Sequence, residues 1–176
     1  GAHLELAVAE LTRAIVIAGG TVVYGGSINW GFTNIVLDEA ERYGSPAGAF
    51  EHYVPYTEHA GVAQADLDAY ASGLSVKARV QLIDATGAAR EVADARAASF
   101  ARGEVDLSEA LTAMRKVTSD VSDARVVLGG KVTGFAGAFP GVAEEAALTA
   151  TLGKPLFIAG GFGGAATLVG RIAHPD

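Results

Sequence analysis

Cysteine is absent from this 176-residue sequence, so disulfides and thiolate metal sites are excluded. Basic runs are absent as well. The 13 Lys and Arg residues are outnumbered by 20 Asp and Glu, and the formal net charge is −7. A nucleic-acid backbone recruits clustered positive side chains, so we expect no nucleic-acid partner. The lack of disulfides suits the cytoplasm, which is the location we expect.

Long hydrophobic runs are missing too. The apolar stretch 14–23 is interrupted by Gly19 and Gly20 and is well under the roughly 20 residues that a membrane span needs. We therefore expect no membrane partner. No secretory signal can be recognised at the N-terminus, and we expect the natural chain to begin before Gly1. The length fits one domain over residues 1–176 with one principal site.

Three motifs of nucleotide and hydrolase chemistry do not occur. The sequence contains no GxGxxG, no GxxxxGK[ST] and no GxSxG. A standard dinucleotide fingerprint, a triphosphatase loop and a nucleophile elbow are therefore not supported. The four histidines show no metal-ligand spacing, so we expect neither a metal site nor a catalytic residue of these classes.

The hydrophobic pattern alternates between helical and extended periods. Apolar residues at helical spacing predict helices at 3–18, 32–43, 66–71, 91–101, 107–119, 140–151 and 165–172. Short apolar runs predict strands at 21–24, 76–84, 124–128 and 155–159, whereas 52–61 shows no clear period. This alternation predicts a Rossmann-like α/β fold, with a mostly parallel sheet and helices on both faces.

Glycine is abundant, with 23 residues, and its placement is informative. Three predicted strands, ending at Tyr24, Leu128 and Ala159, are each followed at once by two glycines. Ligands of open parallel sheets bind outside the carboxyl ends of the strands, so we expect these turns to bring bare backbone to a ligand at one rim. The alternative at each turn is that glycine serves the geometry alone.

Two of these turns carry polar side chains next to backbone donors. The first, Gly25-Gly26-Ser27, leads toward a predicted helix whose start offers N–H groups to a phosphate. The second, Gly129-Gly130, is followed by Lys131, whose ammonium would pair with a phosphate. A solvated loop lysine is the alternative for Lys131.

The helix opened by Pro140-Gly141 and the last glycine turn add two further candidates. Glu144 and Glu145 lie in the first turn of that helix, where acids contribute roughly 0.3 to 1 kcal/mol through the helix dipole. The functional alternative is that one of them accepts hydrogen bonds from a ribose hydroxyl. Phe162 stands among four glycines and is either a core residue or a ring on which a base stacks.

These residues resemble a known group of proteins. The similarity lies in the runs Tyr24-Gly25-Gly26, Leu128-Gly129-Gly130-Lys131, Pro140-Gly141-Val142-Ala143-Glu144-Glu145, Lys154-Pro155-Leu156-Phe157 and Gly160-Gly161-Phe162-Gly163-Gly164. They look like the SLOG superfamily, which joins the Smf/DprA proteins and the Lonely Guy (LOG) proteins. The resemblance spans most of the chain and implies a Rossmann-like fold with a nucleotide site at the strand edges. It implies that this site is lined by Gly25, Gly26, Ser27, Gly129, Gly130, Lys131, Gly141, Glu144 and Phe162.

Within the superfamily, LOG enzymes cleave the N-glycosidic bond of nucleoside monophosphates and carry a PGGxGTxxE signature. This sequence keeps Pro140, Gly141 and a nearby glutamate but not the GxGT centre. It looks more like the sensor branch found in bacterial antiviral proteins. There, a SLOG domain binds a cyclic ADP-ribose-type or other NAD-derived messenger and switches an attached effector such as a TIR or Sir2 NADase, as in Thoeris defence. The resemblance thus implies a non-catalytic homo-oligomer fused to an effector; the alternative is a LOG-like nucleotide N-glycosidase or phosphoribohydrolase.

One departure from the superfamily concerns the first element. SLOG domains usually begin with a strand whose turn contributes to the pocket, whereas this chain opens with the helix at 3–18. Either the sequence begins after that strand or part of the pocket is missing, which would weaken binding. The identity of the ligand and of any fused effector stays open.

Overall fold

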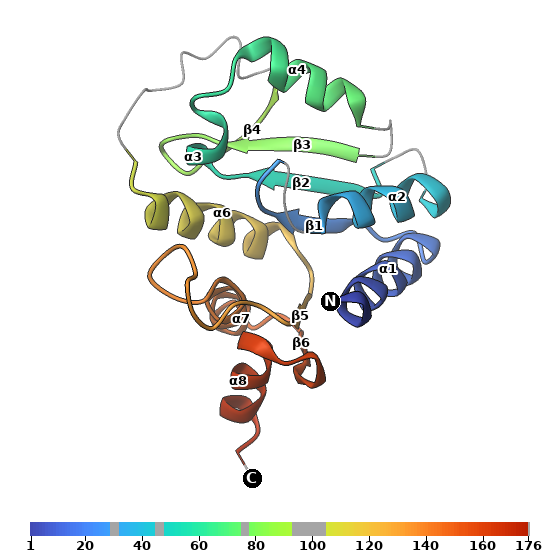
Figure 1. Ribbon diagram of the computed structural model, residues 1–176, viewed down its shortest axis with the longest axis vertical. Coiled ribbons are helices and arrows are strands. Elements are labelled where there is room, and N and C mark those ends of the chain that lie inside the picture. The colour runs from blue at the N-terminus through green and yellow to red at the C-terminus, as the bar shows by residue number, and fades with distance from the viewer. Residues whose placement is uncertain (29–31, 45–47, 75–77, 93–104, 176) are drawn as a thin grey trace. The chain divides into compact units, whose positions relative to one another are not determined.

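The computed structural model describes residues 1–28, 32–44, 48–74, 78–92 and 105–175. Its contacts divide the chain into two compact units, Gly1–Asp106 and Leu107–Asp176. Within the described residues, the first unit holds a four-stranded sheet and the second a two-stranded sheet. Each unit is described by itself below, with the labels of Figure 1.

The first unit alternates helices with strands. Its elements are α1 (Ala2–Ile17), β1 (Val22–Gly25), α2 (Thr33–Tyr43), β2 (Phe50–Val54), α3 (Tyr56–His59), α4 (Gln64–Gly73), β3 (Ala78–Ile83) and β4 (Ala89–Glu91). The strands lie in the order β1-β2-β3-β4 (Figure 1). The first three are parallel and β4 is antiparallel to β3. The predicted mostly parallel sheet is confirmed, with one antiparallel strand at its edge.

The core of this unit lies between the middle of the sheet and α4. Val54 of β2 joins Val80 and Leu82 of β3 in one buried cluster, and Leu67 of α4 packs against it. Side chains two residues apart on a strand share a face, so His52 lies on the same face as Val54, and it is fully buried. The hydrophobic face of β2 therefore includes one polar residue at its centre.

Helix α1 packs against α2 through one stripe of its surface. Val8, Thr12 and Val16 recur at a spacing of four and are the buried residues of α1. At the edge of this contact, Arg13 Nε donates to Glu39 Oε2 at 2.9 Å. The two helices predicted at 3–18 and 32–43 are thus present and pack on each other.

The turn between β3 and β4 is built around Asp84. Its Oδ1 accepts hydrogen bonds from the backbone N–H and the hydroxyl of Thr86, at 2.9 and 2.6 Å, and from the Ala88 N–H at 3.0 Å. Its Oδ2 accepts from Arg90 Nε at 2.8 Å. Burial by itself would raise the pKa of Asp84, but these hydrogen bonds outweigh it and lower that pKa to about 2. The carboxylate therefore stabilises the hairpin.

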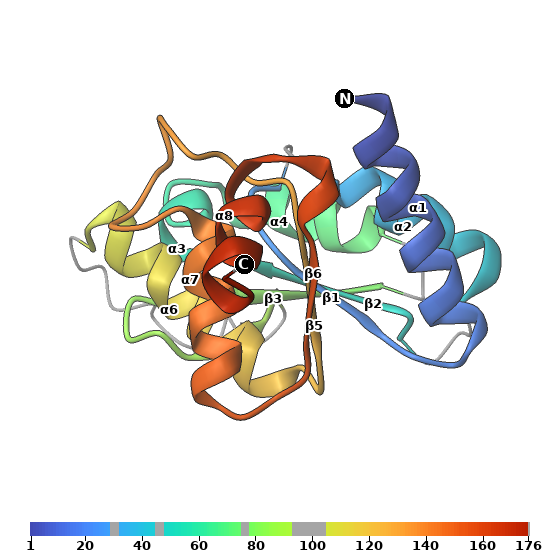
Figure 2. The ribbon, with the colours of Figure 1, turned by 90° about the horizontal axis from the view of Figure 1, so that it is seen from below.

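The second unit consists of two parallel strands and the helices around them. Its elements are α6 (Leu107–Val121), β5 (Arg125–Leu128), α7 (Gly141–Thr151), β6 (Leu156–Ala159), the 3-10 turn η1 (Gly160–Phe162) and α8 (Gly164–Ala173). Strands β5 and β6 run side by side, and α7 and α8 lie on the same side of the pair (Figure 2). The four predicted elements from 124 to 172 are confirmed, and η1 is an addition.

Two segments differ from the sequence-based expectation. Strand β2 occupies part of a region for which no strand was predicted, because Glu51 and His52 interrupt its apolar pattern, although His52 is buried. The helix predicted at 91–101 is wrong at its start, since Glu91 belongs to β4. The remainder of that prediction, from 93 onward, lies outside the described residues. No helix in the described ranges has the length and apolar character that crossing a membrane requires.

Replacing Asp84 with Asn should lower the free energy of unfolding by about 2 kcal/mol at neutral pH, because that is the order of magnitude linked to its pKa shift. A pKa that is lowered on folding stabilises the protein above the ordinary value of 3.8, and this stabilisation is lost as the pH falls to about 2. Between pH 5 and pH 2, the free energy of unfolding, measured with denaturant, should therefore fall more steeply with decreasing pH for the wild type than for D84N. Asp38→Asn, at an exposed position of α2, is the matched control. Identical pH profiles for D84N and the wild type would contradict this role.

Candidate functional site

The ends of β5 and β6 bring two of the predicted glycine turns together. Leu128 is the register partner of Ala159 in the parallel pair. Gly129-Gly130 and Gly160-Gly161 therefore leave the two strands at the same edge, which agrees with the rim predicted for them. The third turn, Gly25-Gly26, is at the end of β1 in the first unit.

The start of α8 is bonded to the end of β5. The N–H groups of Ala165 and Ala166 donate to the carbonyls of Gly130 and Gly129, at 3.0 and 2.8 Å. Gly164 has a φ of +68°, and a Cβ at this position would overlap the Gly130 carbonyl oxygen. Two N–H groups of this helix start are thus already satisfied, and the close backbone approach requires glycine at 164.

Packing also explains Gly130 but not Gly161. Gly130 has a φ of +87°, and a Cβ there would lie 2.7 Å from Cγ2 of Val142 in α7. At Gly161, a Cβ would meet no described atom within 4 Å. Both residues are exposed, but packing against Val142 requires glycine at 130, whereas the space beside Gly161 is open.

Gly164→Ala should lower the free energy of unfolding by about 2 kcal/mol or more, because the added methyl group meets backbone and the residue must keep a left-handed conformation. Gly161→Ala, three residues earlier, should change it by less than about 0.5 kcal/mol. Denaturant unfolding of the two variants measures both effects. Equal destabilisation by the two substitutions would show that the described contact between α8 and β5 does not exist in solution.

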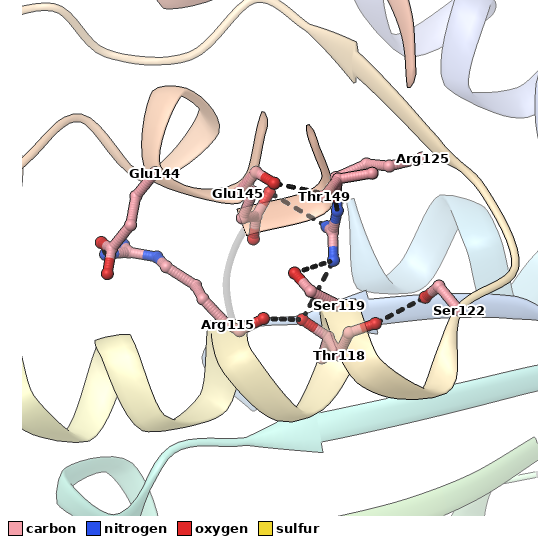
Figure 3. Close-up of polar contacts among 8 residues, drawn as sticks. All are labelled: Arg115, Thr118, Ser119, Ser122, Arg125, Glu144, Glu145 and Thr149. Carbon is pink, nitrogen blue, oxygen red and sulfur yellow. Dashed lines mark hydrogen bonds and ion pairs between the residues drawn. The ribbon is translucent and has the colours of Figure 1, made fainter. Parts of the chain in front are cut away.

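A buried ion pair joins α6 to the start of α7. Arg115 of α6 reaches toward Glu144 of α7 (Figure 3), and its Nη1 lies 2.5 Å from Glu144 Oε2. The hydroxyl of Thr112 donates to Glu144 Oε1 at 2.6 Å. The side chains of Arg115 and Glu144 are only 8% and 11% exposed. Both carboxylate oxygens are therefore held by protein donors, at the end of α7 where the helix dipole favours negative charge.

Two glycines make room for the Arg115 guanidinium. A Cβ at Gly141, the first residue of α7, would lie 2.7 Å from Arg115 Nη2. A Cβ at Gly137, in the loop that precedes α7, would lie 3.3 Å from Nη1, and Gly137 also has a φ of +104°. The guanidinium thus lies close to the loop and the helix start, and a larger residue at 141 would displace it from this position.

A second ion pair lies behind the first. In β5, Nη1 of Arg125 lies 3.3 Å from Glu145 Oε2. The Nε of Arg125 donates to the Thr149 hydroxyl at 3.0 Å. Its Nη2 donates to the hydroxyls of Thr118 and Ser119, each at 3.2 Å (Figure 3). Burial raises the pKa of Glu145, while Arg125 opposes that shift. This network ties α6, β5 and α7 together and so fixes the elements that carry Arg115 and Glu144.

The remaining candidates of the second unit lie at the surface. Lys131 is exposed in the loop between β5 and α7. Phe162, in η1, is 44% exposed, so its ring is not a core residue. In the first unit, Ser27 is half-buried just after β1. None of these side chains has a described contact that identifies a ligand, so their binding roles stay predictions.

Sequence reasoning missed Arg115. It is among the buried residues of α6, together with Ala110, Met114 and Thr118, which recur at helical spacing. A charged residue on the buried stripe of an amphipathic helix is unusual and requires a partner, because charges are almost never fully buried unpaired. That position was the available signal, and it could have linked Arg115 to a first-turn glutamate of α7.

Comparison with protein families shows which family this chain belongs to. A family model described as SLOG cluster2 matches residues 1–175. The chain belongs to the SLOG cluster2 family. Comparison with curated proteins and with solved structures finds no match. Membership confirms the resemblance to the SLOG superfamily and indicates a nucleotide-related function for this SLOG cluster2 chain.

The described ranges contain no group of three or more His, Cys, Asp or Glu side chains that could hold a metal ion. The ionisable side chains gathered at the start of α7 form paired charges instead, Arg115 with Glu144 and Arg125 with Glu145.

Arg115→Met should lower the free energy of unfolding by about 3 kcal/mol, because it leaves the Glu144 carboxylate buried without its cation. Adding Glu144→Leu should restore most of that loss, since replacing both partners by apolar groups removes the unpaired charge. Denaturant unfolding of the two single variants and the double variant gives the coupling between the residues. Additive effects in this cycle would contradict a buried pair.

Proposed function

We propose that this SLOG cluster2 domain is a cytoplasmic sensor of a nucleotide-derived signal, of the cyclic ADP-ribose type or another NAD-derived messenger. Binding regulates an attached effector, such as a TIR or Sir2 NADase, in antiviral defence. One observation carries the proposal: the buried Arg115–Glu144 pair lies at the start of α7, next to a glycine-rich loop. Family membership supports the nucleotide-related part of it.

The phosphates of the ligand bind at the start of α7 and along the loop before it. The N–H groups of Ala143 and Glu144 already donate to the Pro140 carbonyl, so the anion is left to the N–H groups of Gly141 and Val142, which open α7 and have no partner within the helix. The positive end of the helix dipole favours an anion at this point. Arg115 lies against Gly141 and adds positive charge, and the exposed Lys131 pairs with a phosphate from the loop.

The ribose and the base bind next to the phosphates. Each carboxylate oxygen of Glu144 accepts one hydrogen bond from the protein. A carboxylate oxygen accepts two, so Glu144 has capacity left for ribose hydroxyls. The exposed ring of Phe162 stacks on the base, and the open backbone at Gly161 allows close approach. Gly129-Gly130 shape this rim through their packing.

Gly25-Gly26-Ser27 forms a separate phosphate-binding turn in the first unit. The Gly26 N–H is already bonded to the Tyr53 carbonyl at 3.0 Å, so the turn is anchored to β2. Ser27, half-buried beyond it, supplies its hydroxyl and its N–H to the anion.

Signalling requires that the ligand bind two states of the protein with different affinity. We propose that these states differ in the association of a homo-oligomer that carries the effector. Exposed apolar side chains on α8 support association: Ile172 is 80% exposed, and Leu168 lies one turn away on the same face.

Thermal unfolding with ADP-ribose, cyclic ADP-ribose, AMP and NAD tests the proposal. A ligand present at about 100 times its dissociation constant should stabilise the fold by roughly 2.7 kcal/mol, which raises Tm by roughly 5–10 °C for a chain of this size. Lys131→Ala should reduce the shift, while Lys116→Ala, at another exposed lysine, should leave it unchanged. Absence of a shift with all four compounds would contradict a nucleotide sensor.

The second candidate is a nucleotide N-glycosidase, which the placement of Glu144 favours. A carboxylate beside a phosphate-binding helix start could stabilise an oxocarbenium-like transition state. Incubation with AMP or NAD separates the two functions. A sensor releases no free base, whereas release of adenine or nicotinamide that Glu144→Ala abolishes would replace the sensor by the enzyme.

A further inference from the structure

His52 sits at the centre of β2 in an aromatic surrounding. It is 0% exposed. Its ring stacks with Tyr24 of β1, at 6.1 Å between centroids and 20° between planes, and with Phe50, at 5.9 Å and 23°. The ring of Tyr70, from α4, meets it edge-on at 6.1 Å. Three aromatic rings therefore surround a polar ring on the buried face of the sheet.

The two ring nitrogens of His52 differ in their contacts. Nδ1 lies 2.9 Å from the Tyr70 hydroxyl. Nε2 is fully buried, and no described group meets it in hydrogen-bonding geometry. Burial lowers the pKa of His52 to about 4, so the imidazole is neutral at pH 7. When the Tyr70 hydroxyl donates to Nδ1, Nε2 carries the proton and is a buried donor without an acceptor.

Stability alone does not explain a histidine at this position. A buried polar atom without a partner costs free energy, whereas a phenylalanine ring of similar shape would have no such atom. A site where a sequence departs from its most stable choice is expected to have another role. The surroundings of Nε2 indicate which role that is.

His52 lies next to the Gly25-Gly26-Ser27 turn. It is the register partner of Tyr24, one residue before that turn. A Cβ at Gly26 would lie 3.3 Å from the Tyr24 ring, so the turn folds closely over the same aromatic group. The Gly26 backbone lies close enough to His52 to oppose in part the lowering of its pKa by burial. Since Nδ1 is bonded to Tyr70, Nε2 is the nitrogen left for the turn.

We propose that His52 is a positioning residue of the phosphate-binding turn Gly25-Gly26-Ser27, and that its Nε2–H bonds the Gly26 carbonyl when the turn holds a phosphate. In a trans peptide unit the C=O and the following N–H point in opposite directions. A Gly26 carbonyl drawn inward to His52 therefore turns the Ser27 N–H outward to the anion. Tyr70 contributes by fixing the tautomer that places the proton on Nε2. This inference rests on the proposed function.

The test compares stability with affinity for ADP-ribose. The double variant His52→Phe with Tyr70→Phe removes both polar partners and keeps an aromatic ring at each position. Its Tm should therefore equal or exceed that of the wild type. Its dissociation constant for ADP-ribose should rise by about 10-fold or more, the effect of one lost hydrogen bond that orients the turn. His52→Gln, which keeps a donor near the position of Nε2, should recover part of the affinity. Unchanged affinity in the double variant would overturn the inference.

A second measurement uses the wild type and does not depend on the variants folding. Nuclear magnetic resonance of the imidazole should detect an Nε2–H proton that exchanges slowly when ADP-ribose is bound and faster in its absence. Identical imidazole signals in the two states would overturn the positioning role and leave the proposed function intact. Failure of the wild type to bind ADP-ribose, by titration calorimetry, would overturn both.

Discussion

The contact between the Arg115 guanidinium and the backbone of Gly141 is the constraint on which the second unit depends. A charged group is buried there because Glu144 and Thr112 neutralise and orient the pair. Glycine at 141 lets the guanidinium take this position, because the Cβ of a larger residue would displace it. The result is a helix start that carries a fixed cation and a fixed carboxylate side by side. This combination suits a ligand that carries both phosphate and ribose groups.

The glycines at the strand ends are of two kinds: some are required by packing, and others are not. At 130 and 164 it allows β5, α7 and α8 to approach one another, and the N–H groups of α8 are satisfied by β5. At 161 no contact requires it. The glycine-rich pattern therefore reflects packing as much as binding. A glycine by itself suggests ligand binding only at positions where packing does not already explain it.

The sequence predicted most of the helices and strands because their apolar periods are undisturbed, as in β5, α6 and β6. It failed at β2, where Glu51 and His52 break the pattern although the strand is central and buried. It did point to Glu144, but as an acid favoured by the helix dipole or as an acceptor for a ribose hydroxyl. Its partner Arg115 is 29 residues away on another helix, and only tertiary packing brings the two together. Periodicity could have marked Arg115 as a buried charge of α6 that needs an acidic partner, but the choice of Glu144 as that partner depends on tertiary packing.

The central claim is that the start of α7 and the loop before it bind a nucleotide. Backbone amide resonances of the full chain, recorded during titration with ADP-ribose, test it most directly. Within the second unit, the account predicts that the largest shift changes fall on Lys131, Gly141, Val142 and Gly161, and it predicts smaller changes in α1 of the first unit. Saturating ADP-ribose that leaves these four amides unmoved, or that shifts only residues distant from them in the second unit, would contradict the account.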